Sequence, residues 1–234
     1  RMSKTSKLYK KQLEMFDRQR RYSLTEAIEI LKSMPAIKFD QTVEVAFKMG
    51  VDARKSDQTI RGAVALPKGT GKTVRIAVVA SGPQADEARE AGAEFVGYED
   101  LVDKIKGGWL DFDVLIATSE AMKMVRPLGK VLGPRGLMPN PKTGTVTEAI
   151  GNAVREAKAG RVEFRTDRGA CIHVPIGKLS FAATDLTENF DAVCYALGKA
   201  KPTSAKGTYF ISCTVSGTMT PGVRVDVTQL ARQS

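Results

Sequence analysis

The amino-acid sequence predicts a two-domain protein of mixed α/β and α+β class, in which a Rossmann-like α/β domain is inserted into a discontinuous α+β domain. Three observations lead to this fold class. Apolar runs typical of strands buried on both faces occur in the middle of the chain, alternating strands occur towards its ends, and the ends carry most of the basic excess. We place the discontinuous domain at residues 1–67 plus 160–234 and the inserted domain at residues 68–159.

The first part of the discontinuous domain begins with helical patterns. Residues 7–21 combine a few apolar side chains with many bases, which indicates a basic, weakly amphipathic helix or arm. Ser23 and, three residues later, Glu26 form a capping box, so we expect a helix there that ends at Met34-Pro35. Residues 41–49 then alternate apolar and polar side chains, which predicts a strand with one buried and one exposed face.

The middle of the chain alternates strands with helices. Residues 73–80 and 113–117 are apolar runs of the kind found in strands buried on both faces of a parallel sheet, and a short strand is expected at 95–96. Helical segments lie between these strands and follow the last one. This order predicts a small, doubly wound α/β layer.

Beyond residue 159 the alternation of strands and helices stops. Strands are predicted at 161–167 and 170–176, followed by a helix at 185–199 and further strands at 207–216 and 223–227. The alternation of apolar and polar residues in these strands matches residues 23–66 and not the middle of the chain. Both chain ends are therefore assigned to one domain.

The charge distribution supports the same division. The chain has a formal net charge of +10, which favours a polyanionic partner such as RNA. Residues 68–159 hold 13 Lys and Arg against 12 Asp and Glu, whereas the two flanks hold 23 against 14. We therefore expect the polyanion to bind the discontinuous domain.

Composition argues against several kinds of site. The single histidine, His173, excludes a histidine-cluster metal site, and the three cysteines are widely spaced without a Cys-x-x-Cys pair. We expect no catalytic residues, no metal and no cofactor. No apolar run is long enough to cross a membrane and the first residues do not resemble a secretory signal, so we expect a cytoplasmic protein without a membrane partner. Arg1 before Met2 is unexplained.

A nucleotide-dependent enzyme is the alternative hypothesis, because LPKGTGKT at residues 66–73 resembles a phosphate-binding loop. That loop requires a glycine where this chain has Leu66, and it must follow a strand and precede a helix. Here the sequence Gly71-Lys72-Thr73 precedes the expected strand. The interpretation as a connection between elements is preferred.

Residues 128–146, LGKVLGPRGLMPNPKTGTV, contain four glycines and three prolines. This density predicts a long, shaped loop without helix or central strand, of the kind that is usually functional.

That loop, together with KFDQTVEVAFKMGVD, SDQTIRGAVALP, GWLDFDVLIAT, KAGRVEFRTDRG and KGTYFISCTVSGTM, resembles the bacterial-type ribosomal protein L1 (uL1) family. The resemblance covers essentially the whole chain in order. It implies a discontinuous α+β domain and an inserted α/β domain joined by a hinge, as inferred above.

The resemblance implies a structural constituent of the large ribosomal subunit that binds rRNA in the mobile side stalk, near the exit-site tRNA. It also implies binding to the protein's own messenger RNA and repression of its translation. We expect a monomer when the protein is free, and a location on cytoplasmic ribosomes, with an organelle ribosome left open.

The RNA contacts of the family correspond to particular residues of this chain, which we take as candidates: Lys38, Phe39, Thr42, Glu44, Arg165, Thr218 and Met219. The family loop usually reads Thr-Met-Gly-Pro, whereas this chain has Thr218-Met219-Thr220-Pro221. Glycine suits positive φ or close approach to a ligand, and the residue before proline favours extended backbone. We therefore do not include Thr220 among the expected contacts.

Overall fold

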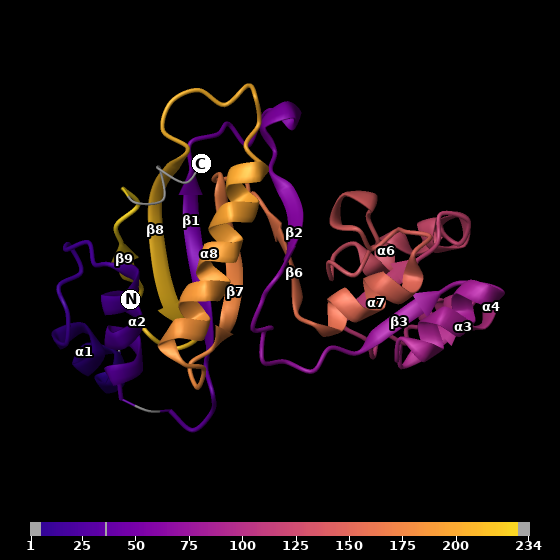
Figure 1. The fold of residues 1–234 in the computed structure, drawn as a ribbon, viewed down its shortest axis with the longest axis horizontal. Helices are drawn as coiled ribbons and strands as arrows, with labels where there is room; N and C mark the ends of the chain where they lie inside the picture. The colour runs from indigo at the N-terminus through magenta and orange to yellow at the C-terminus, as the bar shows by residue number, and fades with distance from the viewer. Residues whose placement is uncertain (1–5, 36, 229–234) are drawn as a thin grey trace, which may run out of the picture. The chain divides into compact units, whose positions relative to one another are not determined.

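The computed structural model describes residues 6–35 and 37–228 (Figure 1). Its chain forms two compact units: unit 1 comprises Arg1–Gly71 with Val162–Ser234, and unit 2 comprises Lys72–Arg161. Both units contain helices and sheets, so the prediction of a two-domain protein of mixed α/β class is confirmed at that level.

Unit 1 is built on a four-stranded antiparallel sheet with the order β7-β1-β8-β9. The strands are β1 (Thr42–Met49), β7 (Cys171–Lys178), β8 (Phe210–Gly217) and β9 (Val223–Val225). The helices are α1 (Lys7–Glu14), α2 (Leu24–Ser33) and α8 (Ala183–Lys199), with a 3-10 turn η1 (Ser56–Gln58). Strands β2 (Arg61–Ala65) and β6 (Arg161–Arg165) pair separately as a two-stranded sheet.

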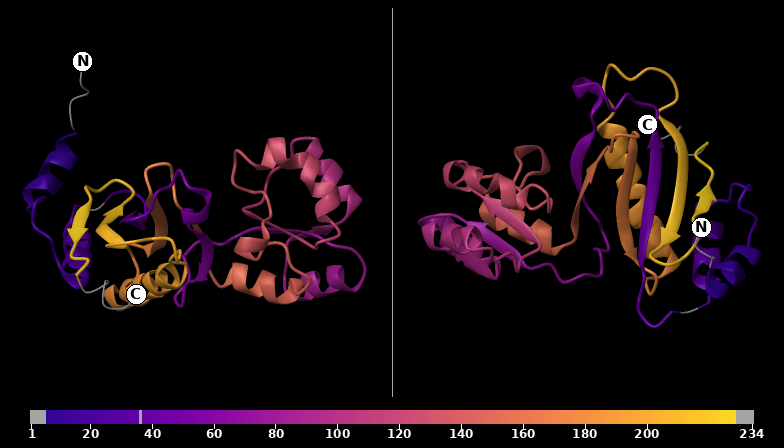
Figure 2. Two further views of the ribbon diagram at one scale, coloured as in Figure 1. Left: turned by 90° about the horizontal axis from the view of Figure 1, so that it is seen from above. Right: turned by 180° about the vertical axis from the view of Figure 1, so that it is seen from behind.

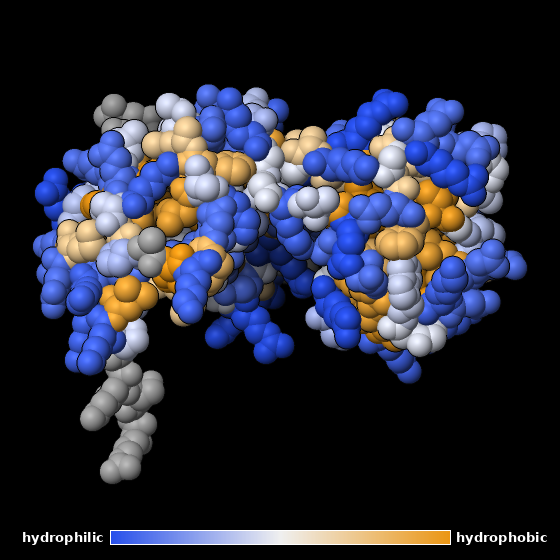
Figure 3. All heavy atoms as spheres, turned by 90° about the horizontal axis from the view of Figure 1, so that it is seen from below, coloured by the Kyte–Doolittle hydropathy of each residue, from blue (hydrophilic) through white to orange (hydrophobic). Residues whose placement is uncertain are grey.

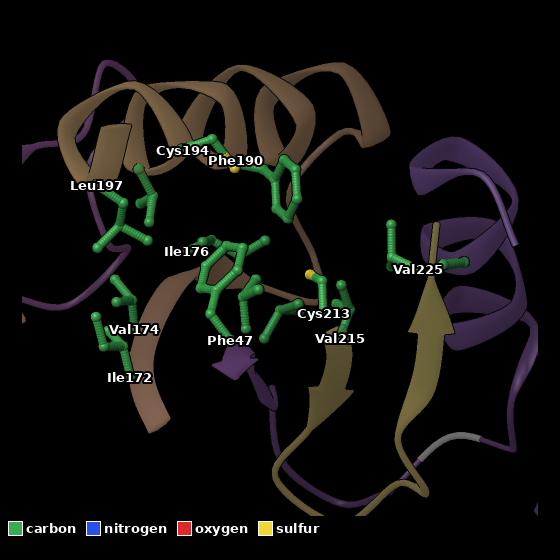
Figure 4. Close-up of a cluster of buried hydrophobic side chains, with 14 of the residues drawn as sticks. Phe47, Ile172, Val174, Ile176, Phe190, Cys194, Leu197, Cys213, Val215 and Val225 are labelled. Atoms are coloured by element: carbon green, nitrogen blue, oxygen red, sulfur yellow. The ribbon is translucent and has the colours of Figure 1, made fainter. Parts of the chain in front are cut away.

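One face of the four-stranded sheet packs against α8 and α2 (Figure 4). Phe47 of β1 lies between Phe190 of α8 and Phe210 of β8, with ring centroids 5.9 and 5.8 Å apart. Cys194 and Cys213 are buried in the same core, where burial raises the pKa of both thiols, and both are free, as is Cys171. No helix of residues 6–35 or 37–228 covers the other face of the sheet: seen from behind, the strands lie in front of α8 (Figure 2, right).

The start of α2 follows directly from its sequence. The Ser23 side chain accepts the backbone N–H of Glu26, and the Glu26 carboxylate accepts the backbone N–H of Ser23. These bonds satisfy donors that the first helical turn leaves without partners. The predicted capping box is confirmed.

Unit 2 is built on a three-stranded parallel sheet with the order β4-β3-β5. Its strands are β3 (Ile76–Val79), β4 (Phe95–Gly97) and β5 (Val114–Ala117). Strands β3 and β5 are shorter than the strands predicted at 73–80 and 113–117. Helices α4 (Glu99–Lys106), α5 (Met122–Val125) and α6 (Gly129–Leu132) contribute to the core on one face. Helices α3 (Pro83–Glu90) and α7 (Ile150–Lys158) contribute to the core on the other. The sheet is buried on both faces, as its apolar runs predict.

The loop prediction for residues 128–146 is wrong in part. The segment contains α6 and the 3-10 turn η3 (Pro141–Thr143), and the 3-10 turn η2 (Arg126–Leu128) ends at its first residue. Glycine disfavours long helices, but it does not prevent single turns, and Pro141 occupies a first-turn position that needs no N–H donor. Gly144 ends η3 in the left-handed region at φ 69°.

The last residues of unit 1 before residue 72 are held by a buried amide. Asn189 of α8 is fully buried; its Oδ1 accepts the Lys68 backbone N–H at 3.0 Å. Its Nδ2 donates to the carbonyls of Gly69 at 3.0 Å and Ile176 at 2.7 Å. One side chain therefore joins a helix, a strand and the segment that leads to unit 2.

We expect Asn189→Ala to destabilise unit 1 by about 2 to 3 kcal/mol, because it leaves buried backbone groups without partners. Asn152→Ala is the control, since Asn152 is exposed and its side chain accepts a long hydrogen bond from Arg155 at 3.4 Å. The measurement is denaturant unfolding followed by circular dichroism, with the single tryptophan, Trp109, reporting separately on unit 2. Equal losses in the two variants would contradict the role of Asn189.

Candidate nucleic-acid interface

The open face of the four-stranded sheet follows from the alternation of β1. Val43, Val45, Phe47 and Met49 point into the core, so the side chains between them lie on the opposite face. The strand register places Glu44 between Pro175 and Ser216, and Ala46 between His173 and Thr214. Polar or exposed side chains of this face are Thr42, Glu44, Lys48, His173, Lys178, Ser212, Thr214, Ser216 and Arg224. We call this surface the open face.

Five of the seven residues predicted from the sequence lie at the end of the sheet where β1 begins. They are Lys38, Phe39, Thr42, Thr218 and Met219. Glu44 also lies on β1, two residues beyond Thr42. Phe39 and Met219 are 51% and 55% exposed, which is unusual for large apolar side chains and makes them available to a ligand. Figure 3 looks at this end of the sheet and shows hydrophobic beside hydrophilic surface on unit 1.

A buried glutamine shapes the turn that carries Thr218 and Met219. Gln41 is 2% exposed, and its side-chain oxygen accepts the Met219 backbone N–H at 2.9 Å. A Cβ atom at Gly217 would lie 3.1 Å from that oxygen and 3.2 Å from Thr220 Oγ1, so the close approach favours glycine here. The role of Gln41 was not predicted, because a polar residue before a strand gives no signal in the sequence that it is buried.

The hydroxyl of Thr218 ties its turn to the first residue of β1. Thr218 Oγ1 accepts the Thr42 backbone N–H at 3.1 Å and lies 3.4 Å from the Thr42 carbonyl oxygen. The Thr42 hydroxyl in turn accepts from Lys178 Nζ at 3.0 Å. Thr218 therefore positions backbone, whereas the Thr42 hydroxyl proton has no acceptor among residues 6–35 and 37–228.

Thr220 closes the same turn. Its hydroxyl oxygen accepts the Gly217 backbone N–H at 2.7 Å, and its own N–H donates to the Gly217 carbonyl at 3.2 Å. Among the described residues Ala170 is the only non-glycine with positive φ, so Thr220 adopts ordinary backbone. The Thr220 hydroxyl is therefore hydrogen-bonded within the turn.

The structure does not bring Arg165 to the other candidates. Arg165 is the last residue of β6, just before the turn that leads to Cys171. Cys171 pairs with Lys48, near the end of β1 that is opposite to Thr42. Seven residue steps separate Thr42 from Met49, a distance of about 23 Å at roughly 3.3 Å per residue. Arg165 lines a separate hollow of about 430 Å³ together with Thr59 and Arg168.

The turn beside Arg165 is held by Asp167. Its carboxylate accepts the backbone N–H groups of Cys171 at 2.7 Å and Gly169 at 2.8 Å, and these bonds hold the pKa of Asp167 below its usual range. Lys48 Nζ donates to the Gly169 carbonyl from the open face. The turn is therefore a rigid border of that face.

The structure confirms the order of elements around Lys72. The loop precedes β3, so it lies at the amino end of that strand, whereas open α/β sheets bind ligands at the carboxyl ends. Lys72 Nζ forms a salt bridge with Asp113 Oδ1 at 2.7 Å. That hydrogen bond, together with the backbone N–H of Arg75, holds the pKa of the Asp113 carboxyl below its usual range.

One segment of unit 2 carries basic residues without any acidic ones. Between Ala121 and Thr147 the chain contains no Asp or Glu, and it carries exposed basic side chains at Lys123, Arg126, Lys130, Arg135 and Lys142. We call residues 121–147 the basic segment. Its end pairs with the sheet, because the Ala117 N–H donates to the Thr145 carbonyl at 3.0 Å. The near-neutral charge of the middle of the chain therefore hides a local excess.

Within the described residues, no group of three or more His, Cys, Asp and Glu side chains is placed to hold a metal ion. No helix of that part of the chain combines the length and hydrophobicity required to cross a membrane.

We expect Asp113→Asn to destabilise unit 2 by about 1 kcal/mol at neutral pH, because it removes the carboxylate that pairs with Lys72 and Arg75. The Asp113 pKa is lowered on folding, so its stabilisation is complete above about pH 4 and is lost as the pH falls through the lower folded pKa. The difference in the free energy of unfolding between Asp113→Asn and wild type should therefore shrink as the pH falls below about 4. Unfolding is measured by the fluorescence of Trp109. Its ring centroid lies 4.7 Å from that of Phe95 and 5.5 Å from that of Phe112, so its emission reports on the packing of unit 2.

A constant difference between pH 7 and pH 3 would contradict this assignment. Asp103→Asn is the matched control in the same unit, since Asp103 is exposed and forms an ion pair with Lys106, three residues away.

Comparison with known proteins gives a match over most of the chain. A family model described as the ribosomal protein L1p/L10e family matches residues 30–221. Large ribosomal subunit protein uL1 of Chlamydia caviae is 54% identical over 229 residues, which are 98% of this chain and 99% of that protein. The uL1 protein of Chlamydia pneumoniae shows the same identity and coverage.

Proposed function

Because this chain belongs to the ribosomal protein L1p/L10e family, we propose that it binds the rRNA of the large-subunit side stalk through the open face of unit 1. It is a non-enzymatic constituent of the large ribosomal subunit. The observation that carries the proposal is an uncovered sheet face lined with hydrogen-bonding side chains and bordered by exposed apolar ones.

The chemistry of this face suits RNA. Sequence-specific recognition of RNA uses hydrogen bonds to sugars and exposed base edges together with stacking on aromatic side chains. Ser216, Thr214 and Glu44 offer the hydrogen bonds, and Phe39 offers the stacking surface. Lys38, Lys178 and Arg224 supply positive charge around them, which attracts phosphates.

Glu44 has a distinct role in this proposal. A carboxylate repels phosphates, so at the centre of an RNA-binding face it contributes only by accepting a hydrogen bond from a sugar hydroxyl or a base amine. Its neighbours in the sheet, Pro175 and Ser216, bring no positive charge to neutralise it. We therefore assign Glu44 to reading the RNA and the surrounding bases to holding it.

The remaining parts of the proposal concern the two units. Unit 1 is proposed to be the discontinuous RNA-binding domain, and unit 2 the inserted Rossmann-like domain. The division of the chain at Gly71 and Arg161 supports this. The basic segment of unit 2 is a candidate contact for the exit-site tRNA, since its exposed bases suit a phosphate backbone. Binding to the protein's own messenger RNA, a monomeric free state and a cytoplasmic location complete the proposal.

A nucleotide-dependent enzyme is less well supported. Lys72 is engaged with Asp113 at the amino end of β3, and the loop lacks the first glycine at Leu66.

We expect Glu44→Gln to weaken binding of side-stalk rRNA by about 1 to 3 kcal/mol, because one charge-assisted hydrogen bond is lost. Binding of an unrelated RNA hairpin should stay unchanged or become stronger, since a negative charge is removed. Glu29→Gln on α2 is the control, because it removes the same charge from an exposed helix position. Isotherms for both RNAs at several salt concentrations measure the effect. Equal strengthening of both RNAs would remove Glu44 from the site.

The division of labour between the units gives a second expectation. A shortened chain that joins residues 1–71 to 162–234 through a short linker should fold and retain most of the affinity for side-stalk rRNA. The isolated unit 2, residues 72–161, should bind the same RNA more weakly than the whole chain. Filter binding of the three proteins decides the matter, and equal affinity of isolated unit 2 and the whole chain would refute the proposal.

A further inference from the structure

Lys178 connects the candidate RNA site with the segment that leads to unit 2. It is the last residue of β7, pairs with Thr42 in the sheet register and donates from Nζ to Thr42 Oγ1 at 3.0 Å. Its stem lies against Gly71, the last residue of unit 1 before unit 2, because a Cβ at Gly71 would come within 2.9 Å of Lys178 Cγ. One side chain therefore touches both places.

The bond from Lys178 determines what the Thr42 hydroxyl offers to a ligand. An ammonium group only donates, so the Thr42 oxygen must act as the acceptor in this bond. The single hydroxyl proton is then left to donate elsewhere. The Thr42 backbone N–H does not compete for the same ligand atom, because it is bonded to Thr218 Oγ1. Thr42 is thus oriented as a donor, suited to an oxygen or ring-nitrogen acceptor of RNA.

The charge of Lys178 has no counterion in the described part of the chain. No carboxylate there lies within 4.0 Å of its Nζ, although the side chain is only partly exposed. The Asp40 carboxylate accepts hydrogen bonds from the hydroxyl and the backbone N–H of Ser180, two residues after Lys178. A partly buried ammonium without an anion is a site for a phosphate group, which supplies both charge and acceptor oxygens.

The segment on the other side of Lys178 depends on close packing. Gly69 and Gly71 both adopt positive φ, at 68° and 70°. The Phe181 ring lies between Gly71 and Gly177, where a Cβ on either glycine would come within 2.9 Å of it. Lys68 adds ion pairs to Asp185 and Glu188 of α8. The Lys178 stem and the Phe181 ring therefore both pack against Gly71.

We propose that Lys178 is an RNA-binding residue that neutralises one phosphate, orients the Thr42 hydroxyl as a donor, and by its contact with Gly71 couples RNA binding to the order of residues 68–71. The proposal rests on the proposed binding of rRNA to unit 1. It adds a positioning role and a link to the segment that joins the units, neither of which follows from an exposed strand face alone.

The test uses the full chain and an RNA fragment of the side stalk. Lys178→Met keeps the stem and removes the charge, and Lys178→Arg restores it. Lys199→Met is the matched control, because Lys199 lies on α8, above the other face of the sheet, over the ring of Tyr195. Affinity at several salt concentrations is measured for each variant, alone and combined with Thr42→Val. Hydrogen exchange of the peptide covering residues 66–72 is followed with and without RNA.

We expect Lys178→Met to weaken binding about tenfold and to reduce the log-log salt slope by about 0.7 to 0.9, the value for one lost phosphate contact. Thr42→Val should cost less in the Lys178→Met background than alone, because the orientation of the hydroxyl is already lost. RNA should protect residues 66–72 in wild type and in Lys178→Arg, but not in Lys178→Met.

The proposal is overturned if Lys178→Met behaves like Lys199→Met, or if its effect and that of Thr42→Val simply add. It is also overturned if RNA protects residues 66–72 equally in wild type and Lys178→Met. If wild type itself does not bind the side-stalk fragment, the proposed function fails instead, so the two failures are distinguishable.

Discussion

The structure of unit 1 depends on the burial of one face of β1 beneath α8. Phe47, in contact with Phe190 and Phe210, fixes the register of β1 in the sheet, and a shift by one residue would turn every side chain to the opposite face. The same packing therefore decides that Thr42 and Glu44 face outwards. Buried residues of β1 therefore determine which of its side chains are exposed.

A second layer of order lies at the end of the sheet. The side chains of Gln41, Thr218 and Thr220 accept hydrogen bonds from the backbone N–H groups of Met219, Thr42 and Gly217. These bonds hold the exposed Met219 and the Thr42 hydroxyl in place in the free protein. A surface ordered in advance loses less conformational entropy on binding than a mobile one. This explains why a turn rich in small polar residues suits recognition. The polar side chains around the site act largely through the backbone.

Sequence patterns predicted the elements better than the contacts. The alternation of residues 41–49 and the capping box at Ser23 gave the strand and the helix within one or two residues, because both depend on local chemistry. Gln41 and Lys178 were missed, since their roles come from residues more than 130 positions away. The short helical turns within residues 128–146 were missed because glycine density argues only against long helices. Arg165 carried no signal that it lies at the far end of the sheet.

The central claim is that rRNA lies on the open face of unit 1. The most direct measurement is ultraviolet cross-linking of large ribosomal subunits that contain this protein, followed by mass-spectrometric mapping of the peptides that carry RNA. The account predicts cross-links to rRNA within residues 38–49, 171–180 and 210–224, which form the open face and its border. Cross-links confined to residues 72–161 would contradict it.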